Sequence, residues 1–260
     1  MKKTMLLCSA LALCGVAIAG TYSSVVGFYH IKLAPGAAII AANQMENGSD
    51  SAGLNEDINN AFKGLLSDPA GRVNTTLHDW NGTGFDSYQY FTGADATRFF
   101  NVALTNAGFY ASNGSRLSGP LPPGDACFLI NPSTNTLNLT VNGYVPMGTN
   151  YVQVSTGYNM YSLAEPFSTN ITAGTAYAGY VGTSDGLGRT NDVLQIWTGA
   201  GYLSYRYFTS TDATRYFKKT ISQSGFFNTN GVVQTPNLPV GTGFFLIHSG
   251  APKVWVTHWP

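Results

Sequence analysis

A repeat with a fixed offset of 117 residues constrains this chain more than any other feature. When residues 74–130 are laid on residues 191–247, 25 of the 57 positions are identical and no gap is needed. The identical positions include Trp80 and Trp197, and the run Asp-Ala-Thr-Arg at 95–98 and 212–215. Such a duplication predicts two copies of one structural unit. We therefore expect two tandem homologous modules related by a pseudo-twofold axis.

The patterns within each copy are typical of β-strands. Residues 77–91 and 194–208 each contain an apolar segment, a glycine-rich turn and an aromatic segment, which predicts a hairpin. Residues 137–141 alternate apolar and polar side chains, as a half-buried strand does. One amphipathic helix is expected at 54–66, with a weaker counterpart at 171–181. The predicted fold class is mainly β with one short helix per module, each module being a β-sandwich or barrel-like unit.

The N-terminus has the three parts of a secretory signal peptide. Lys2 and Lys3 are basic, Met5–Leu13 is apolar, and Ala17-Ile18-Ala19 provides a small-residue cleavage site. Cys14 suggests a lipoprotein as the alternative, but Leu13 precedes it where a small residue is required. We therefore expect export to the extracellular space or the cell surface of a bacterium, with the periplasm as the alternative.

Removal of residues 1–19 would leave module 1 at 20–146 and module 2 at 147–260. Of the 13 basic residues, Lys2 and Lys3 would be lost, leaving 11 against 13 acidic residues and a net charge of −2. This charge argues against nucleic acid, which a basic surface binds through counterion release. No later apolar run is long enough for a transmembrane segment. Cys127, the one cysteine outside the signal, lies in an apolar run and is expected to be buried.

The two copies end differently. Residue 260 corresponds to residue 143 at the 117-residue offset, so the second copy lacks the end of its last strand. The segment 25–29 is similar to 141–145, which contains the missing piece. Because unpaired strand edges are costly, we expect the N-terminal strand to complete the C-terminal one. Pairing within the chain would close a two-module body, whereas pairing between chains would build a head-to-tail polymer.

The chain has no recognisable catalytic, cofactor or metal motif. Asp79 and Asp86 flank the first hairpin turn, but their counterparts Ile196 and Leu203 are apolar, which favours a solvated turn over an acid pair. The four histidines lack metal-binding spacing; they are His30, His78, His248 and His258. We expect no catalytic residue, no metal and no cofactor.

Two sets of repeated residues are candidates for ligand binding. The hairpin aromatics could stack on sugar rings or could pack in the core; they are Tyr88, Tyr90, Tyr205 and Tyr207, with Trp80 and Trp197 expected chiefly as core anchors. Arg98 and Arg215 each follow an aspartate by three residues, a spacing that suits a capped helical turn. The alternative for both arginines is polar recognition of a ligand.

These repeated motifs also carry a family resemblance. Trp-x-Gly-x-Gly-[Phe/Tyr] begins at residues 80 and 197, and Leu-Pro-x-Gly-x-x-x-Phe-Leu-Ile begins at 121 and 238. The combination resembles tandem β-rich modules in a group of uncharacterised secreted bacterial proteins. The first copy departs from that pattern, with Ala126 and Cys127 where the second has Gly243 and Phe244. The resemblance implies architecture and export, and no activity.

Together these features favour a secreted, non-enzymatic structural or surface protein that acts by assembly or binding. Its expected partners are further copies of itself and components of the cell surface or extracellular matrix. The alternative is an extracellular carbohydrate-binding protein that uses the hairpin aromatics. A glycan hydrolase is the third hypothesis, and it would require an acid pair in a cleft.

Overall fold

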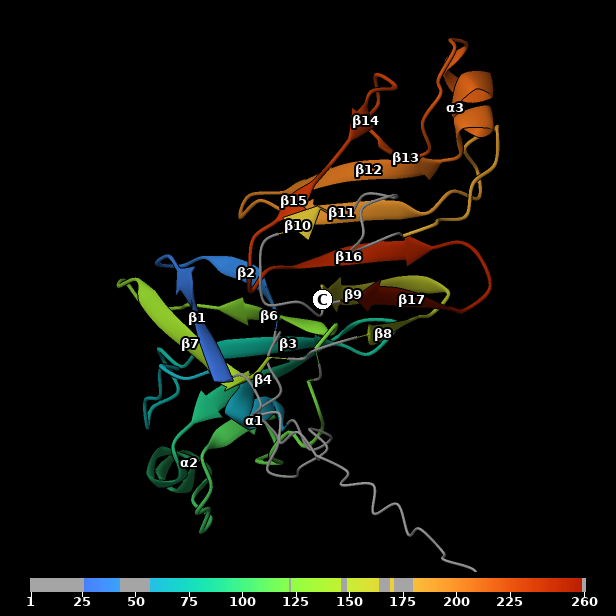
Figure 1. Cartoon of the computed structure of the whole chain (residues 1–260). Coiled ribbons are helices and arrows are strands. Elements are labelled where there is room, and N and C mark those ends of the chain that lie inside the picture. The colour runs from blue at the N-terminus through green and yellow to red at the C-terminus, as the bar shows by residue number, and fades with distance from the viewer. Residues whose placement is uncertain are drawn as a thin grey trace, which may run out of the picture.

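The computed structural model is mainly β, as the sequence predicts (Figure 1). It describes residues 26–42, 57–121, 123–145, 149–163, 169–170 and 180–258. The expected signal peptide and most of the weak helix expected at 171–181 lie outside these residues.

The N-terminal half, residues 26–145, contains seven strands and two helices among its described residues. They are β1 (Val26–Leu33), β2 (Ala38–Ala42), α1 (Ile58–Ala61), β3 (Thr76–Trp80), β4 (Phe85–Phe91), α2 (Gly93–Phe100), β5 (Gly108–Tyr110), β6 (Ala126–Ile130) and β7 (Leu137–Tyr144). Strands β2, β6, β3, β4 and β5 form one antiparallel sheet in that order, and β1 pairs with β7 in a separate two-stranded ribbon.

The C-terminal half, residues 149–258, is built in the same way. Its described elements are β8 (Thr149–Val154), β9 (Gly157–Ser162), β10 (Thr169–Asn170), β11 (Val193–Trp197), β12 (Tyr202–Phe208), α3 (Ser210–Phe217), β13 (Gly225–Phe227), β14 (Val233–Gln234), β15 (Asn237–Leu238), β16 (Gly243–His248) and β17 (Lys253–His258). The main sheet has the order β14-β13-β12-β11-β16-β9, and β17 pairs with β8 in a second ribbon.

Equivalent strands of the two halves pair in the same register. Leu77 of β3 lies opposite Tyr88 and Leu129, and Leu194 of β11 lies opposite Tyr205 and Leu246, each at the 117-residue offset. Both predicted hairpins are present, as β3–β4 and β11–β12.

Each ribbon covers one face of the main sheet of its own half. In the N-terminal half, alternate residues of β1 and β7, including Leu33 and Leu139, are buried with Leu77 and Leu129 of the sheet. In the C-terminal half, Trp255 of β17 is likewise buried with Leu194 and Leu246 of the main sheet. Because successive side chains of a strand point to opposite faces, the other face of each ribbon is turned outward.

The N-terminal strand does not complete the C-terminal one within the chain. Strand β1 pairs along its length with β7, from Val26 opposite Tyr144 to Leu33 opposite Leu137. Strand β17 pairs instead with β8, which opens the C-terminal half. The expectation failed because each half supplies both strands of its own ribbon.

The helix expected at 54–66 is much shorter. Helix α1 spans Ile58–Ala61, capped by Asp57, whose carboxylate accepts the Asn59 backbone N–H at 3.0 Å. Phe62 is already extended, and Lys63 exchanges backbone hydrogen bonds with Thr140 of β7. The apolar stripe that suggested a long helix is therefore buried by a short helix and an extended segment. The described residues hold two short helices in the N-terminal half and one in the C-terminal half, against the expected one per module.

The two halves contact each other through the outer faces of their main sheets. The indole N–H of Trp80 donates to the carbonyl of Tyr158 at 2.7 Å, and that of Trp197 donates to the carbonyl of Ala38 at 2.7 Å. Both tryptophans pack on a cluster formed by Ile40, Ala126, Met160 and Phe245. They join the two halves, where the sequence had suggested that each anchors the interior of its own module.

Candidate functional site

A polar cleft lies where the two halves meet. Its volume is about 350 Å³, and one wall carries Asp79 and Trp80 at the end of β3 together with Asp125 just before β6. The opposite wall carries Asn159 and Tyr161 of β9. The pairing of Asp125 with Tyr161 in an isolated antiparallel bridge holds the two walls together.

Burial and a neighbouring negative charge raise the pKa of each of the two carboxyl groups in this cleft. The surrounding protein atoms, and secondly the negative charge of Asp79, raise the pKa of Asp125 to about 6. Burial, followed by the charge of Asp86 directly across the β3–β4 ladder, raises the pKa of Asp79. Asp125 nevertheless remains accessible to solvent. A carboxyl group of this kind can exchange a proton near pH 6 or bind hydroxyl groups.

The acid pair belongs to one half only. At the 117-residue offset, Asp79 corresponds to Ile196 and Asp125 corresponds to Thr242. The sequence pattern favoured a solvated turn for Asp79 and Asp86 and did not point to Asp125. The signal that could have identified Asp125 is an acidic residue directly after the Leu-Pro-x-Gly motif of the first copy, where the second copy has Thr242.

The hairpin tyrosines do not form exposed platforms. Tyr207 is 2% exposed and is part of the core of the C-terminal half. Tyr205 is half-buried against the same core, and Tyr88 and Tyr90 pack in the same manner against the core of the N-terminal half. Stacking on a sugar needs a free ring face, so this geometry favours the alternative, in which these rings are core residues.

The repeated Asp-Ala-Thr-Arg runs form the helices α2 and α3. Asp95 Oδ2 accepts the hydroxyls of Ser67 at 2.6 Å and Thr92 at 2.8 Å, and these bonds, with the weaker effect of Arg98, lower its pKa. Asp212 makes the same two contacts, with Ser184 and Thr209, in α3. Arg98 and Arg215 are exposed, and no ion pair involves either within the described residues.

The histidines are not brought together. His30 Nδ1 lies 3.0 Å from the Thr140 hydroxyl, and burial lowers the pKa of His78. His258 ends β17. No group of three or more potential metal-binding side chains occurs within the described ranges.

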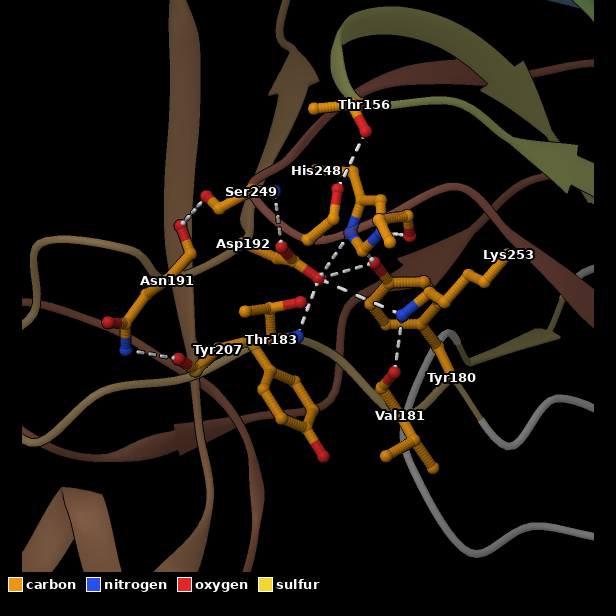
Figure 2. Close-up of polar contacts among 12 residues, drawn as sticks. Thr156, Tyr180, Val181, Thr183, Asn191, Asp192, Tyr207, His248, Ser249 and Lys253 are labelled. Carbon is orange, nitrogen blue, oxygen red and sulfur yellow. Dashed lines mark hydrogen bonds and ion pairs between the residues drawn. The ribbon is translucent and has the colours of Figure 1, made fainter.

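His248 belongs to a buried polar network that is centred on Asp192 (Figure 2). Asp192 Oδ2 accepts the Tyr180 hydroxyl at 2.6 Å and the Thr183 backbone N–H at 2.8 Å, and it lies 3.0 Å from His248 Nδ1. The other carboxylate oxygen accepts the Ser249 backbone N–H at 2.8 Å. Asp192 therefore ties the end of β16 to the segment before β11.

The network also holds positive charge. Lys253 Nζ lies 3.8 Å from Asp192 Oδ2 and 3.9 Å from the centre of the Tyr180 ring, and it donates to the Val181 carbonyl. Burial lowers the pKa of Lys253, an effect that Asp192 partly offsets. His248 Nε2 lies 2.8 Å from the Ala251 carbonyl oxygen, so both ring nitrogens lie within hydrogen-bond distance of an oxygen atom. With every ring nitrogen engaged, the network is built to cross-link the fold.

Comparisons with known proteins identified no similar protein. No family model matches the sequence, and neither a curated protein nor a solved structure matches it significantly. Within the described residues, no helix is long and apolar enough to cross a membrane.

Proposed function

We propose that this chain is a secreted, non-enzymatic structural or surface protein that acts by assembly through the outer faces of its two ribbons. Export is inferred from the N-terminal sequence, with its basic, apolar and small-residue segments. The observation that carries the proposal is a pair of outward ribbon faces that bear large apolar side chains.

The β8–β17 ribbon has the more continuous apolar face. Tyr151 is 65% exposed and lies directly opposite Val256, which is 47% exposed. Val254, two residues along β17, is also exposed on this face. Contiguous apolar side chains on an outer sheet face are typical of protein interaction surfaces.

The β1–β7 ribbon repeats this arrangement in the other half. Phe28 of β1 is 68% exposed, and Tyr144 of β7 lies diagonally across from it on the same face. Among the described strands, β8 and β17 pair only with each other, as β1 and β7 do. We infer that the repeat arose by duplication and gives the molecule two such surfaces, a geometry that supports chain-like assembly.

The test is the size of the protein that begins at residue 20, measured by light scattering across a concentration series with negative-stain microscopy. We expect concentration-dependent oligomers or filaments. The double variant Tyr151→Ser/Val256→Thr should remain monomeric, while the control Val102→Thr, at an exposed valine outside both ribbons, should assemble normally. A monodisperse monomer at every concentration would contradict the proposal.

A second candidate function is glycan cleavage in the cleft between the halves. It is favoured by the perturbed Asp79–Asp125 pair beside the Trp80 ring. In this function Asp125 would donate the proton and Asp79 would act as the carboxylate. Release of reducing sugar from a polysaccharide panel between pH 5 and 6 should then fall by about 10²-fold or more in Asp125→Asn. It should persist in Asp86→Asn, and no release by the unmodified protein would eliminate this candidate.

A further inference from the structure

A second pocket lies in the C-terminal half, away from both the ribbons and the cleft. Its volume is about 290 Å³, and it is formed between the β11–β12–β13 face and α3, at the top of the view in Figure 1. Neither the proposed assembly surfaces nor the cleft between the halves includes this pocket. Its position on a rigid sheet makes it suitable for a preformed ligand site.

Arg206 is the one charged residue that lines this pocket. On the sheet it stands between Val193 of β11 and Phe227 of β13, which are its directly opposite neighbours and line the same pocket. The arginine is half-buried, and no carboxylate of the described residues lies within ion-pair distance of it. A partly desolvated guanidinium without a counter-charge is costly, and a bound anion would offset that cost.

Aromatic rings form the apolar walls. The rings of Phe208 and Tyr216 lie 4.9 Å apart between centroids, and those of Phe217 and Phe227 lie 5.7 Å apart. Tyr216 is 39% exposed, so part of its side chain is open to solvent. Rings of this kind pack against the apolar faces of small cyclic ligands.

The loop before β11 lies close to both the arginine and this tyrosine. Gly188 has φ +70°, and a Cβ added there would lie 2.6 Å from Tyr216 Cε2 and 3.1 Å from Arg206 Nη1. Only glycine permits this close approach. The absence of a side chain at Gly188 therefore leaves room for the guanidinium and the ring at this edge of the pocket.

The rim of the pocket is polar. Ser204, Asn228 and Thr229 line it and offer hydroxyl and amide groups. The Asn228 side-chain oxygen accepts the backbone N–H groups of Asn230 and Val232 at 3.0 Å each, which fixes the orientation of that amide. One cation, free aromatic surface and a hydroxyl-rich rim together match a ring that carries both a carboxylate and hydroxyl groups.

The N-terminal half has the same scaffold without the charge. Gln89 corresponds to Arg206 and stands between Thr76 and Tyr110 in the same register. Phe99 of α2 corresponds to Tyr216, and Phe100 corresponds to Phe217. The arginine is therefore not required to fold this layer.

We propose that the Arg206 pocket binds a carboxylated sugar ring, such as one hexuronate residue of an acidic glycan. The guanidinium pairs with the carboxylate through two parallel hydrogen bonds. The Tyr216 ring contacts an apolar face of the sugar, and the rim binds its hydroxyl groups.

The experiment is a calorimetric or NMR titration of the protein that begins at residue 20, with galacturonic acid, galactose and acetate as probes. Galacturonic acid should bind at least about tenfold more tightly than either other probe, because each lacks one of the two recognised groups. Arg206→Gln, which installs the residue of the N-terminal half, should weaken galacturonic acid binding by about tenfold or more. The control Arg72→Gln, at an exposed arginine of the N-terminal half that does not line the pocket, should bind as the unmodified protein does.

Three outcomes would overturn the proposal, in addition to the acetate result described below. They are no binding of galacturonic acid at millimolar concentration, equal binding of galactose, and unchanged affinity in Arg206→Gln. Acetate binding as tight as galacturonic acid would reduce the pocket to a general carboxylate site and contradict sugar recognition. If Arg206→Gln fails to fold, Arg206→Lys keeps the charge but loses the two-bond geometry, and its affinity should lie below that of the unmodified protein.

Discussion

The two halves bury different polar side chains at equivalent positions of the repeat. In the N-terminal half, Thr75 Oγ1 accepts the Leu66 backbone N–H at 2.9 Å, and Asn131 binds three carbonyls. At the 117-residue offset, the C-terminal half has Asp192 and His248. The backbone around them is unchanged, since Thr75 and Asp192 each exchange bonds with the same neighbouring segments. The scaffold therefore accommodates either Thr75 with Asn131 or Asp192 with His248 without a change in these backbone hydrogen bonds.

The largest expected effect comes from removing the buried carboxylate. Asp192→Ala leaves the His248 ring and the Lys253 ammonium without their common partner, and it frees two backbone N–H groups. We expect a loss of about 3–5 kcal/mol of unfolding free energy, measured by urea denaturation. The matched variant Thr75→Ala should cost about 1–2 kcal/mol. Equal losses would mean that the charge of Asp192 has no special role.

Replacing Asp192 and His248 together should lower the free energy of unfolding less than replacing Asp192 alone. The variant Asp192→Thr/His248→Asn removes both ionisable side chains and installs the residues of the N-terminal half. We expect it to be more stable than Asp192→Thr alone, with a coupling of about 1–3 kcal/mol in a double-mutant cycle. Additive effects of the two single variants would argue that Asp192 is held by Tyr180 and Lys253 and not by His248.

The next contrast concerns the contact between the halves. Trp80→Phe and Trp197→Phe each remove one indole hydrogen bond to a carbonyl of the other half. Ala38 and Tyr158, the two acceptors, lie opposite Ile130 and Ile247, which are themselves 117 residues apart. We therefore expect equal losses of about 1 kcal/mol each in urea denaturation. A clearly larger loss for one variant would contradict a pseudo-twofold contact.

The sequence predicted what depends on local pattern and missed what depends on distant pairing. The hairpin signals at 77–91 and 194–208 identified β3–β4 and β11–β12, because turn glycines and alternation act over a few residues. Asp192 and His248 are 56 residues apart, and only the fold brings them together. Their signal was present in the repeat, as a change from Thr75 and Asn131 at otherwise similar positions.

Two further failures have a physical cause. The helix expected at 54–66 was wrong because its apolar stripe is equally compatible with a short helix that leads into an extended segment. Ribbon pairing was assigned to the wrong strands because alternation specifies which face is buried but not which strand lies alongside. The cleft was missed for the same reason as the buried network, since Asp79 and Asp125 meet only across β3 and β6.

The smallest expected effect is a pH dependence of stability that comes from Asp125 and that its neutral counterpart, Thr242, does not produce. The pKa of Asp125 is raised in the folded protein to about 6, against about 3.9 for an unfolded chain. The folded state therefore binds more protons between these values, and stability should fall as pH rises from about 4 to about 6. Because the side chain reaches solvent, the fall in unfolding free energy should be about 1 kcal/mol or less.

The variant Asp125→Asn should remove this pH dependence and be more stable than the unmodified protein at pH 7. A change at Thr242, the neutral counterpart, should leave the pH dependence intact. Urea midpoints measured from pH 4 to pH 7 test this directly, and parallel curves for Asp125→Asn and the unmodified protein would show that Asp125 titrates as it does in water.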